Sequence, residues 1–470
     1  MGSIFDIVAM GSIFDISARG AVAGNSSVAA MWQTGAVINA TLAALLPGDT
    51  MLVPDGIFHT FGGLYASNLQ DATIQIDGTL RFAGGEHRKE WPRDARGRVM
   101  ECLNIEHSDG LTFTSSAAAG TLDGNGEAWW GAIQYLVHEE DRPRLLKIHN
   151  ASSILVEKLL FKQPPYWTTL FDDVDGVTIR HSNISVHRTN ATTHDIVELQ
   201  AFNTDGFDVA GRNVHIHDVQ IWNDDDSVCV KPMSGGGHRA TCSENWLVER
   251  VNASGVGLTL GSISPSRQVN CMRNITFRDS LMVNTWKGIY IKTLTSDDPQ
   301  SSGIIEDILY ENITMASPTG WPIWIGPAAQ AEGGNTCLFW PRLPGSKCPT
   351  EPKMTLRNIV LRDIRIDNPK GSPGVVMGNA SNPIDVTFDG VVVTNPGADP
   401  WGDAYYSCWG ANGTAIGGTW PVPPCFNGGR QCLADGVCVD AAGTPCCSGA
   451  EHFTLECPLA AGGKRCGSAS

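Results

Sequence analysis

Three consecutive aspartates, Asp224, Asp225 and Asp226, interrupt a stretch that otherwise has the apolar composition of a β-strand. A further aspartate, Asp205, stands upstream in the segment Asn203-Thr-Asp-Gly206. Carboxyl groups held side by side repel one another's charge and separate their pKa values, which leaves one group protonated and another ionised. Such a pair supplies a general acid and a general base, the combination that hydrolysis of a glycosidic bond requires.

A loose repeat between about residue 100 and residue 395 predicts the elements that carry these aspartates. Each repeat has a turn residue, usually Asn, Asp or Gly, followed by an alternating apolar stretch and a second short apolar run. Copies begin at Gly176, Asn213, Asn245, Asn274, Asp307, Asn358 and Asp385. One repeat is too small to bury a core, so the copies must stack on one another. We therefore expect an all-β fold, a right-handed parallel β-helix, because a β-sandwich would use hairpin turns instead of repeating one order.

Stacking of the repeats predicts where the aspartates lie. Residues one coil apart are separated by about 4.8 Å, so side chains a coil length apart line up across one sheet face. Asp205 and the triplet are separated by such a length, and the segments with Gly257 and Lys292 follow in the next coils. We expect successive coils to build one transverse site. Because a strand points neighbouring side chains to opposite faces, the chain must bend or bulge at Asp225 and Asp226 for both to serve.

The composition limits the partners and the cellular compartment. A net charge of −16 without a cluster of Lys or Arg argues against nucleic acid and against a membrane surface as partners. Fourteen cysteines, many of them crowded between Cys425 and Cys466, indicate an oxidising compartment. We expect an extracellular, monomeric protein that is glycosylated at some of its ten Asn-x-Ser/Thr sites, although no signal peptide is visible.

Three regions differ in character along the chain. Residues 1–16 contain the heptapeptide Met-Gly-Ser-Ile-Phe-Asp-Ile twice, which indicates a duplicated segment outside the fold. Residues 17–400 form the expected β-helix. In residues 401–470 the apolar alternation fades and cysteines gather, which predicts a small disulfide-rich tail in which Cys408 supplies the eighth cysteine.

Several short motifs follow one another in order. Gly120-Thr-Leu-Asp-Gly-Asn-Gly-Glu-Ala-Trp-Trp130 comes first, and Asn203-Thr-Asp-Gly-Phe-Asp208, Asn223-Asp-Asp-Asp-Ser227 and Gly288-Ile-Tyr-Ile-Lys-Thr293 follow. Over roughly residues 12–395 this order resembles that of the polygalacturonase-like pectinases, glycoside hydrolase family 28. The resemblance implies a parallel β-helix enzyme that hydrolyses pectic polysaccharide with inversion and needs no cofactor.

The resemblance also implies roles for single residues. Asp225 would be the general acid, while Asp205 and Asp226 would hold and deprotonate the attacking water. Substrate contacts would come from the positions of the family's motifs that are occupied here by Asn203, Gly257, Tyr290 and Lys292. Among the tryptophans, we expect at most two sugar contacts from the set Trp167, Trp222, Trp286, Trp321 and Trp324.

Two positions depart from the family pattern. Val256 stands where the family has the histidine of Gly-His-Gly, and Tyr290 stands where it has the arginine of Arg-Ile-Lys. Rhamnogalacturonan hydrolases also lack both residues, which moves the expected substrate away from unbranched polygalacturonan, yet Asp226 is a glutamate in those enzymes. His238, in a glycine-rich loop, is a candidate replacement for the histidine.

Other functions stay open at this point. A glycan-binding protein without activity fits the two departures, and a pectate-lyase-like eliminase would use a similar scaffold with calcium and an arginine base. The triplet itself can also be a solvated loop or a calcium site. New reducing ends on a pectic polymer would separate hydrolysis from these alternatives.

Overall fold

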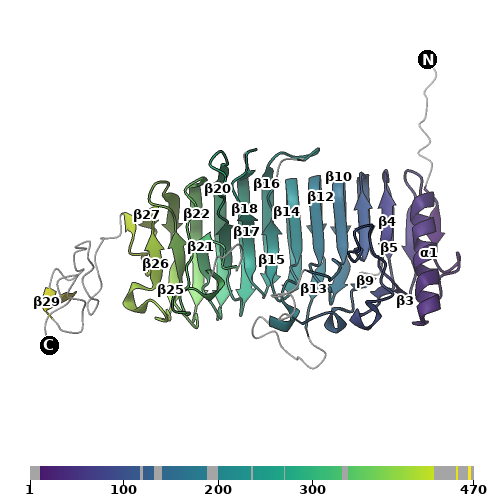
Figure 1. Cartoon of the computed structure of the whole chain (residues 1–470), viewed down its shortest axis with the longest axis horizontal. Coiled ribbons are helices and arrows are strands. Elements are labelled where there is room, and N and C mark those ends of the chain that lie inside the picture. Colours follow the sequence, from purple (N-terminus) through teal and green to yellow (C-terminus); the bar gives the residue numbers. More distant parts are fainter. Residues whose placement is uncertain are drawn as a thin grey trace, which may run out of the picture. The chain divides into compact units, whose positions relative to one another are not determined.

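The computed structural model describes residues 11–116, 120–131, 140–187, 199–233, 237–268, 270–330 and 337–427, together with the short strands at 451–453 and 464–466. Its contacts divide the chain into two compact units, which we call the N-terminal unit (1–229 and 237–241) and the C-terminal unit (230–236 and 242–470). In each unit, strands stack as the rungs of a parallel β-helix (Figure 1). The predicted fold class, an all-β right-handed parallel β-helix, is confirmed.

The N-terminal unit is built on three stacks of parallel strands. One stack runs β2–β5–β8–β10–β12–β14, the second runs β3–β6–β9–β11–β13, and the third runs β4–β7 and joins the first at β10. The strands of this unit are β1 (Ile13–Asp15), β2 (Thr50–Val53), β3 (Ile57–Thr60), β4 (Leu64–Ser67), β5 (Thr73–Ile76), β6 (Thr79–Phe82), β7 (Leu103–Glu106), β8 (Asp109–Thr114), β9 (Gly120–Asp123), β10 (Leu146–Glu157), β11 (Leu159–Lys162), β12 (Thr169–Arg180), β13 (Asn183–Ser185), β14 (Phe207–Trp222) and β15 (Asp226–Val230).

The C-terminal unit repeats this arrangement with the stacks β16–β18–β20–β22–β24–β27 and β17–β19–β21–β23–β26. Its strands are β16 (Ser243–Ala253), β17 (Gly257–Ile263), β18 (Asn270–Val283), β19 (Ile289–Thr293), β20 (Gly303–Ala316), β21 (Ile323–Pro327), β22 (Met354–Asp367), β23 (Gly374–Met377), β24 (Ile384–Asp389), β25 (Val392–Thr394), β26 (Tyr406–Trp409), β27 (Ala411–Ile416), β28 (Phe426–Asn427), and the antiparallel pair β29 (Glu451–Phe453) and β30 (Lys464–Cys466). Single-turn 3₁₀ helices lie at η1 (Gly85–His87), η2 (Gly126–Ala128), η3 (Leu199–Ala201), η4 (Cys337–Phe339) and η5 (Gly402–Ala404).

The turn residues that open each repeat form the corners of the coils. Asn245, Asn274, Asp307 and Asn358 all have φ between 50° and 61°, in the left-handed region that Asn and Asp tolerate better than most residues. Their side chains also bond from coil to coil. The amide of Asn274 donates to Asn245 at 2.8 Å, and that of Asn358 donates to Asp307 at 2.7 Å. The Asn and Asp residues that recur in the sequence are therefore the residues at which successive coils turn.

Alternation along the strands separates a core from a charged outer face. Inside the N-terminal unit, Ile154, Val177 and Val214 are stacked partners on β10, β12 and β14, and all are buried. This stacking removes apolar surface from water at each coil.

On the outer face of the C-terminal unit, the register places Glu249, Arg278, Glu311, Arg362 and Asp389 in one row of alternating charge. Arg278 bonds Glu249 at 2.6 Å, and Arg362 lies 3.1 Å from Glu311 and 3.5 Å from Asp389. Cross-strand pairs of opposite charge support the register of a sheet.

The start of the fold differs from the sequence expectation. Ile13–Asp15 pairs with β2 in parallel and Ile16 is fully buried, so the second copy of the duplicated heptapeptide belongs to the first coil. Residues 1–10 lie outside the described residues. The helix α1 (Val28–Ala44) follows, begins at an N-cap formed by Ser27, and packs its buried face against β3 and β4. Among the described residues, no helix is both long enough and apolar enough to cross a membrane.

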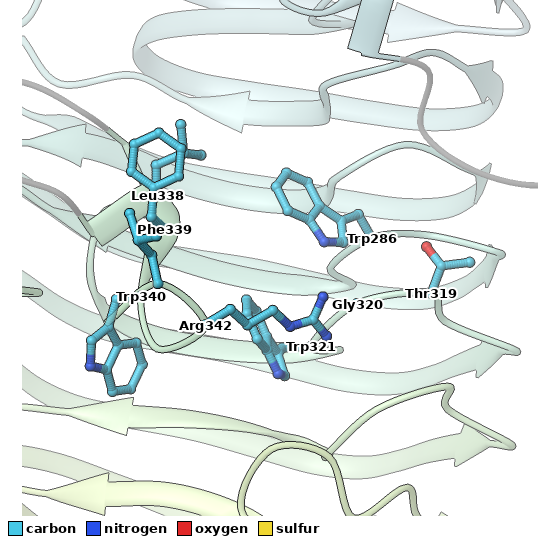
Figure 2. Close-up of a pocket in the computed structure, with 9 residues that line it drawn as sticks. Trp286, Thr319, Gly320, Trp321, Leu338, Phe339, Trp340 and Arg342 are labelled. Atoms are coloured by element: carbon cyan, nitrogen blue, oxygen red, sulfur yellow. The ribbon is translucent and has the colours of Figure 1, made fainter. Parts of the chain in front are cut away.

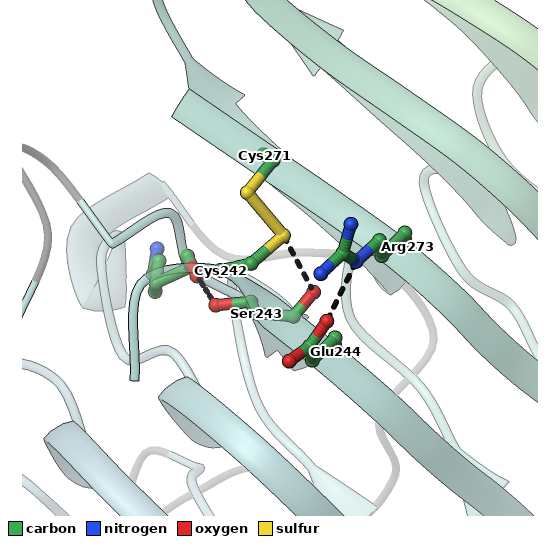
Figure 3. The surroundings of a disulfide bond; sticks show 6 residues. Cys242, Ser243, Glu244, Cys271 and Arg273 are labelled. Carbon is green, nitrogen blue, oxygen red and sulfur yellow. Dashed lines mark hydrogen bonds and ion pairs between the residues drawn. A yellow bond between two sulfur atoms is a disulfide. The ribbon is translucent and has the colours of Figure 1, made fainter. Parts of the chain in front are cut away.

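Parallel pairing also continues beyond residue 400, where the sequence analysis placed a domain boundary. β26 pairs with β23, β27 pairs with β24, and Cys408 is bonded to Cys425. Further disulfides join Cys337 to Cys348 and Cys242 to Cys271. Figure 3 shows the Cys242–Cys271 bond linking neighbouring coils at the start of β16 and in β18, beside the ion pair of Glu244 and Arg273. The remainder of the predicted cysteine-rich tail, residues 428–470 except the strands at 451–453 and 464–466, lies outside the described residues.

Candidate active site

The predicted bend at the aspartate triplet is present. β14 ends at Trp222, residues 224 and 225 form a bend, and β15 begins at Asp226. The backbone N–H of Gly206 donates to the carbonyl of Asp226 at 2.8 Å, and the N–H of Thr168 donates to the carbonyl of Asp205 at 2.7 Å. Asp205 and the triplet therefore lie side by side in successive coils of the N-terminal unit, as the stacking argument predicts.

Two buried side chains that the sequence analysis did not single out hold this bend. The amide nitrogen of Asn223 lies within 3.0 Å of three carbonyl oxygens, those of Thr204, Asp225 and Asp226. The hydroxyl of Thr204 accepts from the N–H of Asp224 at 3.2 Å and donates to a carbonyl in η3. A polar residue at the end of an apolar strand is the sequence signal for Asn223, because a buried amide must find partners.

Three carboxylates converge beside the bend. One carboxylate oxygen from each of Asp205, Asp225 and Asp226 lies within 4.8 Å of the others. The exposed fractions are 2% for Asp205, 6% for Asp225 and 0% for Asp226, so Asp225 is the most accessible of the three. Its two oxygens accept the backbone N–H groups of Asn203 at 3.1 Å and of Asp226 at 2.9 Å, which fixes its orientation. Asn203 has φ of 60°, in the left-handed region, and it contributes its backbone N–H to the site through the bond to Asp225.

The same group of oxygens has the spacing of a metal site. Ca²⁺ takes about six to eight oxygen ligands, whereas the described residues bring only these three acidic side chains together here. Backbone carbonyls and water also ligate Ca²⁺, so the calcium alternative raised by the sequence is tested by the effect of a chelator on activity.

A charged pocket of about 490 Å³ lies in the N-terminal unit, and its lining residue Tyr166 is near enough to Asp205 to feel the charge of that carboxylate. Its charged lining residues are Asp94, Arg98, Glu101, Glu106, Glu140, Arg142, Arg144 and Lys147. Arg142 is buried, bonds Glu140 at 2.8 Å, and donates to the carbonyl of Phe202 at 2.9 Å, next to Asn203. The pocket thus holds four cationic and four acidic side chains, and Arg98, Arg142 and Arg144 are each paired with a carboxylate of the lining.

Tyr166 connects this pocket to the site. Its ring stacks on Trp167 at 5.1 Å, with Arg142 and Arg144 at 5.0 and 5.4 Å from the ring centre. Burial raises the pKa of the Tyr166 hydroxyl, and the negative charges of Asp205 and Glu140 raise it further. The phenol therefore stays protonated and can donate a hydrogen bond toward an acceptor in the pocket.

The other predicted contact residues, Gly257, Tyr290 and Lys292, belong to the C-terminal unit, where the register puts Thr259 opposite Tyr290. Tyr290 is only 3% exposed, and its hydroxyl accepts the N–H of Ala329 at 2.7 Å, which favours packing over sugar stacking for this ring. Gly257 has φ of 100°, and a Cβ there would lie 2.5 Å from the carbonyl oxygen of Gly288. The closeness of the neighbouring backbone is therefore enough to explain why residue 257 is a glycine, without a contact to substrate.

Lys287 is a buried cation that the sequence analysis missed. Its ammonium lies 4.0 Å from the centre of the Trp286 ring, 4.4 Å from that of Tyr290 and 5.4 Å from that of Trp324. Aromatic faces attract a cation, so these rings stabilise a charge inside the unit. The order Trp-Lys-Gly before a strand was the available signal.

Val256 stands at the position of the family's histidine, and it is buried. His238, the candidate replacement, is exposed, and its backbone N–H donates to Asp173 at 2.8 Å.

A second pocket, of about 370 Å³, lies in the C-terminal unit and is mainly aromatic (Figure 2). Trp286, Trp321, Phe339, Trp340 and Arg342 are among the residues that line it. Of the other tryptophans in the predicted set, Trp324 is fully buried, Trp167 packs under Arg144, and Trp222 is exposed on the surface.

Known proteins resemble this chain both in sequence and in structure. A segment of 283 residues is 29% identical to a probable endo-xylogalacturonan hydrolase A of Aspergillus fumigatus and covers 59% of this chain and 63% of that protein. A probable endopolygalacturonase I of Aspergillus niger is 25% identical over 260 residues, which cover 54% of this chain and 60% of that protein. The chain thus spans less than two thirds of the length of these relatives.

Two solved structures share the fold. The endo-xylogalacturonan hydrolase of Aspergillus tubingensis matches with a TM-score of 0.59 and 21% identity, over 85% of this chain and 96% of its own. An exopolygalacturonase of Thermotoga maritima matches with a TM-score of 0.60 and 15% identity, over 87% of this chain and 92% of its own. The sequence model of the glycosyl hydrolases family 28 matches residues 48–414, which is most of the chain, and the protein therefore belongs to family 28 of the glycosyl hydrolases.

Proposed function

We propose that the protein is a secreted enzyme that hydrolyses the galacturonan backbone of pectic polysaccharide with inversion. Asp225 is the general acid that protonates the leaving oxygen, and Asp205 and Asp226 hold and deprotonate the attacking water. The observation that carries this proposal is the convergence of three buried carboxylates, with oxygens within 4.8 Å of one another, beside a charged pocket.

The spacing suits a bound water molecule. A water that donates hydrogen bonds of about 2.8 Å to two acceptors holds those acceptors about 4.5 Å apart. Asp205 and Asp226 are the two least exposed carboxylates of the group, so a water between them is shielded from bulk solvent. Removal of one of its protons by either carboxylate produces the nucleophile.

Asp225 suits the role of acid. It is the most accessible of the three, the backbone N–H groups of Asn203 and Asp226 orient its two oxygens, and in the proposed role one of these oxygens carries the acidic proton. The repulsion of two neighbouring carboxylates favours that proton. The nearest oxygens are closer than the roughly 6.5–9.5 Å that separates the carboxyl groups of most inverting glycosidases. Inversion thus rests on the family resemblance and is decided by the product anomer.

The substrate we favour is a galacturonan that carries branches. Tyr290 and Val256 replace an arginine and a histidine of the polygalacturonase pattern, and several named relatives are endo-xylogalacturonan hydrolases. Secretion is supported by three disulfides, Cys242–Cys271, Cys337–Cys348 and Cys408–Cys425, because such bonds persist in oxidising compartments.

The test is incubation of the purified protein with polygalacturonan, xylogalacturonan and rhamnogalacturonan, with detection of reducing ends, of the product anomer by NMR, and of ultraviolet-absorbing unsaturated products. We expect new reducing ends on a galacturonan backbone, a β-anomer released from the α-linked chain, and no unsaturated product. Asp225→Asn should lower the rate by about 10²–10⁴-fold, and a chelator should leave it unchanged.

Three results would contradict the proposal. Unchanged activity in Asp225→Asn removes the acid assignment. Calcium-dependent ultraviolet absorption identifies an eliminase, and binding of the polymers without new reducing ends identifies a glycan-binding protein.

A further inference from the structure

The aromatic pocket of the C-terminal unit is built by a loop that a disulfide closes. Cys337 and Cys348 are bonded, and the residues between them that the structure describes include Phe339, Trp340 and Arg342. Figure 2 shows Phe339 and Trp340 on the side of the pocket away from Trp286, with Arg342 beside Trp321. A closed loop of this length loses little further entropy when a ligand binds.

The walls of the pocket are positioned by close packing. Trp321 contacts Trp324 at 5.3 Å and Trp401 at 5.7 Å, and Trp340 contacts Trp401 at 5.9 Å between ring centres. Trp286 lies directly against Gly320, where a Cβ would come within 2.0 Å of the indole. The absence of a side chain at Gly320 therefore lets the indole of Trp286 lie against the backbone at the edge of the pocket.

The rim exposes apolar surface that packing does not require. Phe339 and Leu343 are each about half exposed, at 48% and 52%. Exposed aromatic side chains that gather around a concave site commonly mark a ligand site. Faces of aromatic rings are suited to the C–H faces of a sugar ring, which are apolar while its edges are polar.

Arg342 adds one cation to this aromatic surface. Its guanidinium lies 5.4 Å from the centre of the Trp321 ring and 3.3 Å from Asp399. Both members of that ion pair are largely exposed, and an exposed pair contributes only about 0–1 kcal/mol. A carboxylate ligand can therefore replace Asp399 at little cost.

We propose that this pocket binds one uronic acid unit of the polymer, with its ring against the indole of Trp286 and its carboxylate on Arg342. The proposal rests on the proposed function for the identity of the polymer. The volume of about 370 Å³ is at the small end of ligand pockets, as expected for a single sugar. Arg342 sets the preference for an acidic sugar, Trp286 supplies the apolar contact, and Trp321, which is 6% exposed, supports Arg342 from below.

The test measures binding by calorimetry to the Asp225→Asn protein, which keeps the ligand intact. The probes are a linear oligogalacturonate and a neutral xylo-oligosaccharide of the same length. Arg342→Gln should weaken oligogalacturonate binding about tenfold at low salt, an effect that fades in about 1 M NaCl because salt screens exposed charges. Trp286→Ala should weaken it about tenfold at both salt concentrations.

A matched control is Arg267→Gln, which removes an arginine of the same unit that also forms an exposed pair, with Asp298. This control should leave binding unchanged. Equal oligogalacturonate affinity in Arg342→Gln, Trp286→Ala and the control overturns the pocket. Tighter binding of the neutral probe, reduced by Trp286→Ala but not by Arg342→Gln, overturns the assignment to an acidic sugar. Absence of hydrolysis by the wild type, with these binding differences intact, refutes the proposed function alone.

Discussion

The charged pocket of the N-terminal unit and the aromatic pocket of the C-terminal unit are lined by different kinds of residue on the same kind of scaffold. The first is lined by paired cations and carboxylates and belongs to the unit that holds the three buried aspartates. The second is lined by indole rings and a single exposed guanidinium. Buried carboxylates can exchange protons with a substrate, whereas aromatic walls can only hold it. The difference predicts that variants in the first region change the rate of the chemical step and that variants in the second change affinity.

The largest expected effect is a loss of kcat, without a loss of affinity, when one carboxylate of the group of three is replaced. Asp226→Asn should lower kcat by about 10²–10⁴-fold, because the amide cannot accept a proton from the attacking water. Oligogalacturonate affinity, measured by calorimetry, should change little. Asp224→Asn is the control, since Asp224 is outside the group of three, and it should keep more than a tenth of the activity. A reversed order of the two variants would place the base at Asp224.

The second prediction tests whether the C-terminal unit depends on its disulfides. The double variant Cys242→Ser, Cys271→Ser opens a bond between neighbouring coils that spans 29 residues. Its free energy of unfolding should fall by about 3–4 kcal/mol, measured by guanidinium denaturation. Activity per folded molecule should stay the same, because neither cysteine belongs to the carboxylate group. If the fully folded double variant lost activity, the disulfide would be needed for catalysis as well as for stability.

A third prediction compares two buried asparagines, one in each unit. Asn223→Ala removes the amide that holds three carbonyls at the bend, and both the free energy of unfolding, by about 2–3 kcal/mol, and kcat should fall. Asn270→Ala removes one bond, to Ser264, and should cost about 1 kcal/mol without a change in kcat. Chemical denaturation and initial rates check both. Equal effects on kcat would remove the distinction between the units.

The smallest expected effect concerns the outer face. A hydrogen bond from Arg365 lowers the pKa of Asp367, against the opposing effect of burial. A lowered carboxyl pKa stabilises the fold above the unfolded value of about 3.9, and this contribution disappears as pH falls through the folded pKa. Because the pair is exposed, Asp367→Asn should cost less than about 1 kcal/mol at pH 7 and nothing at pH 2. Urea denaturation at both pH values measures this, and an equal cost at both contradicts it.

The repeat in the sequence was enough to predict the β-helix and the alignment of the aspartates. Asn and Asp at left-handed corners are local features, and a stacked repeat places residues one coil apart side by side. The bend at Asp225 also followed, because two neighbouring residues cannot otherwise share a strand face. The motifs follow one another in the order that the family has, and the match of the family model to residues 48–414 confirms the resemblance.

Other features depended on contacts between distant residues. Helix α1 and the strand Ile13–Asp15 take their places through packing on the first coil, so neither was expected. Tyr290 had the chemistry of a sugar contact, but its neighbours bury it and occupy its hydroxyl. The pairing of Cys337 with Cys348 could not be predicted, since no spacing rule selects one partner among many, and the sequence around Lys287 indicated only Trp286 among the rings that surround its ammonium.

The sequence by itself determined the fold, the family and the carboxylates that carry the proposed chemistry, because a repeat and a motif are read along the chain. The tertiary structure decided how accessible each carboxylate is, which side chains hold the bend, and which aromatic rings remain open to a ligand. Burial and hydrogen bonding depend on neighbours that the chain brings together only when its coils stack.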